Sequence, residues 1–204
     1  RYLLGDVIYW IGALAPSLVV MDKEWWRLVT AGFLHADILH IAFNLYALHG
    51  LGALVERFFG MRRFLWVYGV ALFGTGVLVT VLSPLQTMTV GASGAIMGLL
   101  GALLVYYWRY RDLLVGGRNY LNELIKMAVI NVGIGLLPGI SLWGHFGGLL
   151  AGVMVGWALC PRYEYDDFSF SLLRLPLDGR AWGRMVLILG GWLTLLALGV
   201  WLRG

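Results

Sequence analysis

Charged residues and cysteine are scarce in this chain of 204 residues. Asp, Glu, Lys and Arg make up 13% of it, against roughly 25% in ordinary soluble domains, whereas 60% of it is hydrophobic. This composition excludes an ordinary soluble domain and indicates a membrane protein. Because Cys160 is the only cysteine, no internal disulfide can form, and we expect Cys160 to act as a small apolar residue.

Long apolar runs are abundant by contrast. A helix needs about 20 residues to cross the ~30 Å of hydrocarbon in a bilayer. Runs of suitable length predict seven spans, at 3–20, 38–55, 64–82, 91–108, 121–137, 140–159 and 185–202. Asp6 and Pro16 interrupt the first run. The predicted fold class is therefore all-α, a polytopic transmembrane helical bundle, with no room for a second sizeable domain.

The basic residues are distributed unevenly over the predicted loops. The net charge of +4 would suit a nucleic-acid partner, but seven spans with an inside N-terminus gather most basic residues on one side. That side holds Arg1, Arg57, Arg62, Arg63, Arg109, Arg111, Arg118, Lys126, Arg162, Arg174, Arg180 and Arg184, and the other holds Lys23, Arg27 and Arg203. Cytoplasmic loops carry such an excess. We therefore expect a cytoplasmic N-terminus, an outside C-terminus, a lipid bilayer as partner and no nucleic acid.

The segments between spans are short. The stretch 21–37 contains Trp25 and Trp26 and predicts an outer interfacial segment, since tryptophan prefers the headgroup level. Outer loops at 83–90 and 138–142 would form only a thin lid, and the polar stretch 161–184 predicts a cytosolic linker. The chain begins at Arg1 without Met, which is compatible with a trimmed upstream segment, and no cleavable signal peptide is evident.

Small residues recur every four positions on two spans. One stripe comprises Gly144, Gly148, Gly152 and Gly156, and the other comprises Gly94, Gly98 and Ala102. Such stripes let membrane helices approach closely. The spans 91–108 and 140–159 are therefore expected to touch, which would bring Ser93 towards His145.

Four polar side chains lie inside the predicted spans: His40, Asn44, Ser93 and His145. Polar groups in lipid are costly and indicate function by default. Each of the four sits near the outer start of its span, so all share one depth, and His40 and Asn44 share one helical face. Plainer interpretations remain open: Ser93 as a packing residue, and His40 with Asn44 as a structural pair.

Two further histidines, His35 and His49, are interpreted as structural or interfacial. His35 lies five residues before His40 and is therefore expected to point elsewhere.

The chemistry of the four favours a nucleophilic serine. Ser93 becomes a nucleophile when a base such as His145 takes its proton. An oxyanion needs donors, and His40, Asn44 and the Ser93 backbone N–H could supply them. No acidic residue shares this depth, which leaves a Ser–His dyad. A metal site is the competing interpretation, but no His-x-x-x-His pair, thiolate cluster or Glu-rich helix accompanies the histidines. We predict no metal and no cofactor.

Several sequence blocks resemble the rhomboid intramembrane serine proteases. They occur in family order and are WRLVTAGFLH at 26–35, HIAFN at 40–44, GLGALVERFFG at 50–60, GASGAIMG at 91–98 and GHFGGLLAG at 144–152. The resemblance implies Ser93 as nucleophile, His145 as base, and His40, Asn44 and the Ser93 amide as oxyanion donors.

The resemblance also implies secondary roles. Trp26 and Arg27 would belong to the family's outer-leaflet loop, and Glu56 would be structural at the inner end of its helix. Many members carry Tyr or Phe one turn after the nucleophile, where this chain has Met97. Sulfur can contact aromatic rings, so activity is still expected, with the orientation of the base less constrained.

The expected protein is a membrane protease, resembling the family variant with a seventh, C-terminal helix. Its domains would be a six-helix rhomboid-like core at 1–160, a linker at 161–184 and an additional helix at 185–204. It would cleave single-pass transmembrane proteins near the outer boundary of the cell membrane. The alternatives are a catalytically inactive rhomboid-like protein that binds membrane clients, and a small transporter. The retained Ser93 and His145 count against the first, and polar residues confined to the outer leaflet count against the second.

Overall fold

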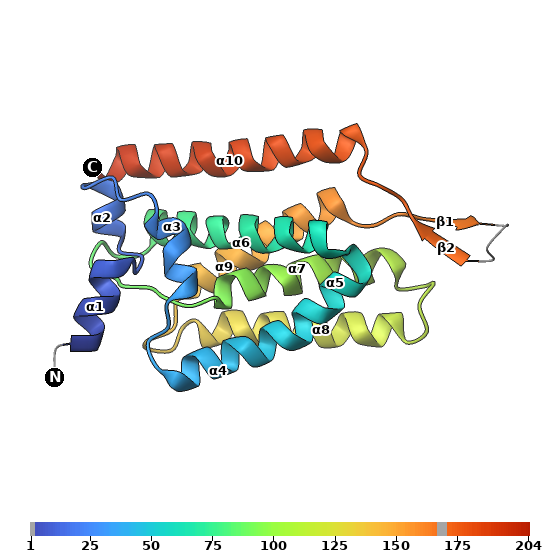
Figure 1. Ribbon diagram of the computed structural model, residues 1–204, viewed down its shortest axis with the longest axis horizontal. Helices are drawn as coiled ribbons and strands as arrows, with labels where there is room; N and C mark the ends of the chain where they lie inside the picture. The colour runs from blue at the N-terminus through green and yellow to red at the C-terminus, as the bar shows by residue number, and fades with distance from the viewer. Residues whose placement is uncertain (1–2, 167–170) are drawn as a thin grey trace.

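The computed structural model describes residues 3–166 and 171–204, which form a bundle of helices with one small β-hairpin (Figure 1). The elements are, in chain order, α1 (Leu3–Ile11), α2 (Pro16–Val20), α3 (Arg27–Thr30), η1 (Ala31–Phe33), α4 (Ile38–Ala47), η2 (Leu48–Gly52), α5 (Ala53–Phe59), α6 (Met61–Leu82), α7 (Ser93–Tyr110), α8 (Gly117–Ile134), α9 (Leu142–Leu159), β1 (Tyr163–Asp166), β2 (Ser171–Arg174) and α10 (Gly179–Arg203). The prediction of an all-α polytopic bundle is confirmed.

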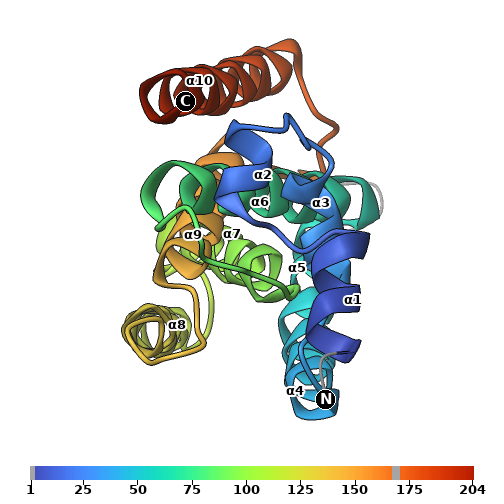
Figure 2. The ribbon, with the colours of Figure 1, turned by 90° about the vertical axis from the view of Figure 1, so that its left-hand side faces the viewer.

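Four stretches of helix in the described residues are long and apolar enough to cross a membrane. They are Ile38–Phe59, which combines α4, η2 and α5, together with α6, α9 and α10. Helices α7 and α8 are as long as α9, with 18 residues each. α7 lies near the centre of the bundle (Figure 2) and most of its side chains are buried, so it needs little lipid-facing apolar surface. The last six predicted spans each overlap one of these helices.

The first predicted span, 3–20, is wrong. Gly12 adopts a φ of +146° directly after α1, and a new helix starts at Pro16. α1 has nine residues, or about 14 Å of helix, too short for the ~30 Å of a bilayer core. Leu14 and Thr89 exchange main-chain hydrogen bonds of 3.0 and 2.9 Å, which hold the α1–α2 connection against the loop that precedes α7.

The predicted placement of the two chain ends on opposite sides is wrong for the same reason. Helix α10 ends beside that same loop, where the guanidinium of Arg203 donates to the main-chain oxygens of Thr80 and Ser83. These oxygens belong to the end of α6, where carbonyls lack helical partners. With no crossing at 3–20, α1 and the end of α10 lie at the same end of the bundle (Figure 1).

Most of the predicted inner basic residues lie at the opposite end of the bundle, around the hairpin and the α7–α8 loop (Figure 1). They are Arg57, Arg62, Arg63, Arg109, Arg111, Arg118, Arg162, Arg174, Arg180 and Arg184, whereas Arg1 lies outside the described residues. Lys126 lies further along α8 and pairs with Glu123 at 2.7 Å. Glu56 is exposed in α5, near the basic end. The basic residues therefore remain concentrated at one end of the bundle, although the segment 3–20 is not a span.

The contact predicted from the two small-residue stripes is confirmed. A Cβ atom built on Gly148 would lie 1.9 Å from the carbonyl oxygen of Gly94, and one on Gly152 would lie 2.1 Å from that of Gly98. Helices α7 and α9 thus touch backbone to backbone. Any larger side chain on this seam would separate them.

The predicted linker 161–184 contains the hairpin and the start of α10. Arg174 donates to the carbonyl of Phe58 at 3.0 Å, which ties the hairpin to α5. Asp178 caps α10 by accepting the N–H of Ala181 at 2.7 Å, and this hydrogen bond lowers the pKa of the Asp178 carboxyl. Helix α10 therefore begins at Gly179 rather than at 185. The division into core, linker and last helix stays a prediction.

Candidate active site

Ser93 is the first residue of α7, and the backbone before it is shaped to expose it. Gly91 has a φ of +116°, and a Cβ at this position would lie 2.6 Å from Nε2 of His40. Glycine at 91 therefore lets the loop pass against the His40 imidazole. The N–H of Ser93 belongs to the first turn of α7, where no preceding helical carbonyl can accept it.

His145 lies in the first turn of α9, at the same depth as Ser93. The side chain of Ser141 caps α9 by accepting the N–H of Gly144, which fixes where this turn begins. His145 is 8% exposed, and its Nε2 lies 3.1 Å from Oγ of Ser93. The α7–α9 contact thus brings the two predicted residues to hydrogen-bond distance.

The other ring nitrogen of His145 faces a main-chain carbonyl. Nδ1 lies 2.8 Å from the oxygen of Asn131, in the last turn of α8. The N–H of Gly135 turns to Val132 instead of Asn131, so that oxygen is free to accept. A carbonyl oxygen cannot donate, so Nδ1 carries the proton and Nε2 is left to accept from Ser93. This partner is absent from the sequence-based prediction, which considered only acidic side chains as partners of His145.

His40 and Asn44 line the same pocket from α4, as their four-residue spacing predicts. The pocket has a volume of about 640 Å³ and is lined by both residues together with Ser93 and His145. Asn44 is buried, and its Nδ2 donates one hydrogen to the carbonyl of His40 at 2.8 Å, which leaves its second hydrogen for another acceptor. Nδ1 of His40 accepts weakly from the N–H of Ala36 at 3.5 Å, which favours a proton on Nε2.

Loops close over this pocket where the thin lid is expected. Residues 87–91 and 139–141 contribute to its wall, and these belong to the connections before α7 and before α9. The buried side chain of Met97 lies one turn below Ser93 and also lines the pocket, in keeping with its expected place near the base.

Two further residues near the site were missed or misplaced by sequence reasoning. Thr75 of α6 is buried and donates to the carbonyl of Gly144 at 3.1 Å, which ties α6 to the turn that carries His145. The sequence feature that could have identified Thr75 is a polar side chain inside an apolar span. His35 packs edge-on against His40, with ring centroids 5.1 Å apart, because α4 starts only at Ile38 and helical spacing does not apply before it. Burial lowers the pKa of His35, and the nearby charge of His40 lowers it further.

Arg27 anchors the segment that was expected to lie at the outer interface. Its guanidinium donates to the carbonyls of Tyr9 and Ala13 at 2.6 and 2.7 Å and pairs with Glu24, and the side chain is 2% exposed. Trp26 beside it is exposed. Within the described ranges, no cluster of three or more His, Cys, Asp or Glu side chains could hold a metal ion.

Comparison of the sequence with known proteins identifies the family to which the chain is similar. The family model described as "Rhomboid domain" matches residues 22–162. The chain is 36% identical over 169 residues to "RHOMBOID-like protein 6, mitochondrial" of Arabidopsis thaliana, covering 79% of this chain and 53% of that protein. It is 40% identical over 149 residues to "Rhomboid protease GluP" of Bacillus subtilis (strain 168), covering 72% of this chain and 28% of that protein. The chain spans about half, or less, of the length of these relatives.

Proposed function

Because the chain belongs to the rhomboid family, we propose that it is an intramembrane serine endopeptidase with Ser93 as nucleophile and His145 as general base. The observation that carries the proposal is the 3.1 Å separation between Ser93 Oγ and His145 Nε2. A relative named as a rhomboid protease supports the reaction class. The proposed domains are the rhomboid core up to 160, the connection that follows, and the last helix.

In the first half of the reaction, Ser93 Oγ attacks the carbonyl carbon of the scissile peptide while its proton passes to His145 Nε2. The imidazolium that forms keeps its Nδ1–H on the carbonyl of Asn131, which stabilises the positive charge. We assign the developing oxyanion to three donors: Nε2–H of His40, Nδ2–H of Asn44 and the N–H of Ser93. Asn131 thus does through its backbone what an acidic side chain does in a triad.

In the second half, the tetrahedral intermediate collapses and the C–N bond breaks. His145 gives its proton to the departing amine, which leaves an ester on Ser93. Water then attacks the ester carbonyl as His145 takes its proton. The second tetrahedral intermediate collapses with cleavage of the C–Oγ bond, His145 returns the proton to Ser93 Oγ, and the new carboxyl end of the substrate is released. In this mechanism water enters the pocket past the loops at 87–91 and 139–141, which contribute to its wall.

The proposed substrates are single-pass transmembrane proteins. A helix in lipid keeps its carbonyls in hydrogen bonds, so a scissile bond becomes accessible only where the substrate helix unwinds. Ser93 and His145 each lie at the start of a long helix, so cleavage would occur near one membrane boundary.

The side of cleavage follows from the charges. Basic residues crowd the end of the bundle opposite Ser93, and cytoplasmic ends carry such an excess. We propose that this basic end is cytoplasmic, that Ser93 faces the outside, and that α1 and the end of α10 lie on the outside with it. The proposed location is the cell membrane, although one relative is named as mitochondrial.

Active-site labelling tests the proposal directly. The purified protein should react with a fluorescent fluorophosphonate, because an activated serine attacks phosphorus as it attacks a carbonyl. Ser93→Ala should abolish labelling and cleavage of a transmembrane substrate, with a melting temperature close to that of the wild type. Undiminished labelling of Ser93→Ala, or a folded wild type that neither labels nor cleaves, would contradict the mechanism.

A further inference from the structure

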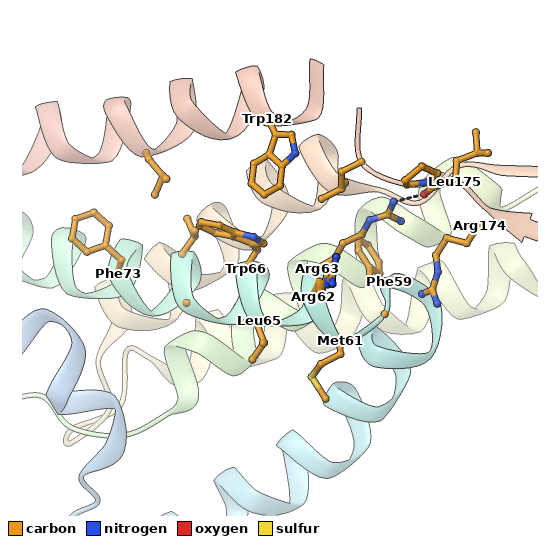
Figure 3. Close-up of a pocket in the computed structure, with 16 residues that line it drawn as sticks. Phe59, Met61, Arg62, Arg63, Leu65, Trp66, Phe73, Arg174, Leu175 and Trp182 are labelled. Carbon is orange, nitrogen blue, oxygen red and sulfur yellow. Dashed lines mark hydrogen bonds between the residues drawn. The ribbon is translucent and has the colours of Figure 1, made fainter. Parts of the chain in front are cut away.

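A second cavity lies at the basic end of the bundle, away from Ser93. It is a groove of about 1010 Å³ between the first turns of α6, the start of α10 and the segment that follows β2 (Figure 3). This groove, lined from α6 by Arg63 and Trp66 and from α10 by Trp182, is here called the inner groove. It shares no lining residue with the pocket of Ser93.

The walls of the inner groove are mostly apolar, and two of its aromatic side chains are partly exposed. Trp66 of α6 and Trp182 of α10 face each other edge to face, with centroids 5.8 Å apart, and are 38% and 45% exposed (Figure 3). Next along α6 is Gly69, where an added Cβ would meet nothing within 4 Å. The groove therefore extends along α6 from Trp66 past the open position at Gly69 to Phe73.

The mouth of the inner groove is positively charged. Arg62 and Arg174 are exposed at its rim, and Arg174 lies against Gly60, the residue that precedes α6. Arg63 is only 6% exposed; its Nη2 donates to the carbonyl of Leu175 at 2.6 Å (Figure 3). Its Nη1 is buried without a hydrogen-bond partner. A buried donor without an acceptor is energetically costly, so an acceptor at this position would be stabilising.

Among the side chains that the structure describes, no carboxylate neutralises this mouth. None of the described Asp and Glu side chains lines the groove, and none of their ion pairs involves Arg62, Arg63 or Arg174. Other arginines at the same end do find acids, as Arg118 does with Asp112 at 2.7 Å. An anion from outside the chain would supply the acceptor that Arg63 Nη1 lacks.

We propose that the inner groove binds an anionic phospholipid. Its phosphate would lie on Arg63 Nη1 between Arg62 and Arg174, and an acyl chain would lie along Trp66 and Gly69. Basic pockets between helices on the cytoplasmic side bind anionic headgroups, and tryptophan marks the interfacial depth. A phospholipid matches both parts of the groove, because its phosphate suits the arginines at the mouth and its hydrocarbon chain suits the apolar wall. Binding here does not depend on proteolysis at Ser93.

Native mass spectrometry of the detergent-solubilised protein tests this. With added phosphatidylglycerol or phosphatidylcholine, the wild type should retain phosphatidylglycerol more tightly. Arg62→Gln/Arg174→Gln should weaken phosphatidylglycerol binding by about tenfold or more, since charge-assisted hydrogen bonds are lost. The matched control is Arg57→Gln/Arg180→Gln, which removes the same charge from exposed residues at this end outside the groove. Its phosphatidylglycerol binding should remain as in the wild type.

A second variant separates a lipid from a free phosphate. Gly69→Leu fills the open part of the channel without changing the arginines. It should weaken phosphatidylglycerol binding while leaving the weak binding of inorganic phosphate unchanged. Inorganic phosphate that displaces phosphatidylglycerol at equal concentration would make this a site for a free anion.

Three further results would overturn the proposal. They are equal retention of phosphatidylglycerol and phosphatidylcholine by the wild type, equal losses in the two double arginine variants, and occupation of the groove by a second copy of the chain or a helical peptide in preference to lipid.

Discussion

At the scale of single residues, His145 is held through both of its ring nitrogens. Nδ1 faces the main-chain oxygen of Asn131 at 2.8 Å and Nε2 faces Ser93 at 3.1 Å. Because the first partner can only accept, one proton position is fixed and the second nitrogen must be the acceptor. The proposed general base would thus have its proton placed before a substrate arrives.

The proposed oxyanion role of Asn44 can be separated from a structural role. Asn44→Ala should lower kcat by about 10²–10³-fold, the usual effect of losing one donor to the developing charge. Its melting temperature should stay close to that of the wild type, because the hydrogen bond it loses goes to a carbonyl within its own helix. The measurements are kcat on a transmembrane substrate and thermal unfolding of the same preparation.

Asn131→Ala is the matched control. The Asn131 side chain makes the same kind of bond, to the carbonyl of Met127 at 2.8 Å, and also lines the pocket. Substitution keeps the main-chain oxygen that faces His145, so kcat should change little. An Asn44→Ala protein that is unstable yet turns over normally when folded would remove Asn44 from the oxyanion site.

Residue type alone could predict part of this site. Ser93, His145, His40 and Asn44 were found because polar side chains are conspicuous in apolar spans. The Asn131 contribution could not be found in this way, since every residue has a carbonyl and only the geometry of a helix end frees one. His35 was misplaced because helical spacing was applied ahead of the first residue of α4.

At the scale of elements, the α7–α9 seam leaves no room for a side chain. Gly148→Ala should destabilise the protein by about 1–3 kcal/mol, since its Cβ would collide with the backbone at Gly94. Activity should fall too, because Gly94 follows Ser93. Gly190→Ala in α10, where nothing lies within 4 Å of the added Cβ, should leave stability unchanged or slightly raised. Equal melting temperatures for the two variants would show that the seam is looser than described.

Periodicity predicted these elements well where helices pack on helices. Four-residue spacing of glycine identified the seam because close approach requires small residues on one face. Hydropathy failed at 3–20 because it registers apolar content and not the backbone turn at Gly12. It also cannot register that Arg27 binds the carbonyls of Tyr9 and Ala13, which holds this apolar segment at one end of the bundle.

At the scale of the whole molecule, the two ends of the bundle should be accessible from opposite sides of the membrane. In a Cys160→Ala background, Met88→Cys near Ser93 should react with a membrane-impermeant maleimide on intact cells. Val115→Cys in the exposed loop at the basic end should react only after permeabilisation. This follows from the basic residues around that loop. The reverse pattern would invert the proposed orientation and move cleavage to the cytoplasmic side.

The bond between His145 and Asn131 joins two helices that meet otherwise through few buried groups. The side chains of α8 are mostly exposed, with only Gly117, Leu124 and Ala128 buried within that helix. The orientation of the proposed base, His145, therefore depends on the position of α8, a helix with few buried residues. If the end of α8 moved away by an ångström or two, Nδ1 would lose its acceptor and the imidazole would be free to rotate or to exchange tautomers. Under the proposed mechanism, turnover would then depend on the distance between α8 and α9, and a substrate that pushes α8 outward would slow its own cleavage.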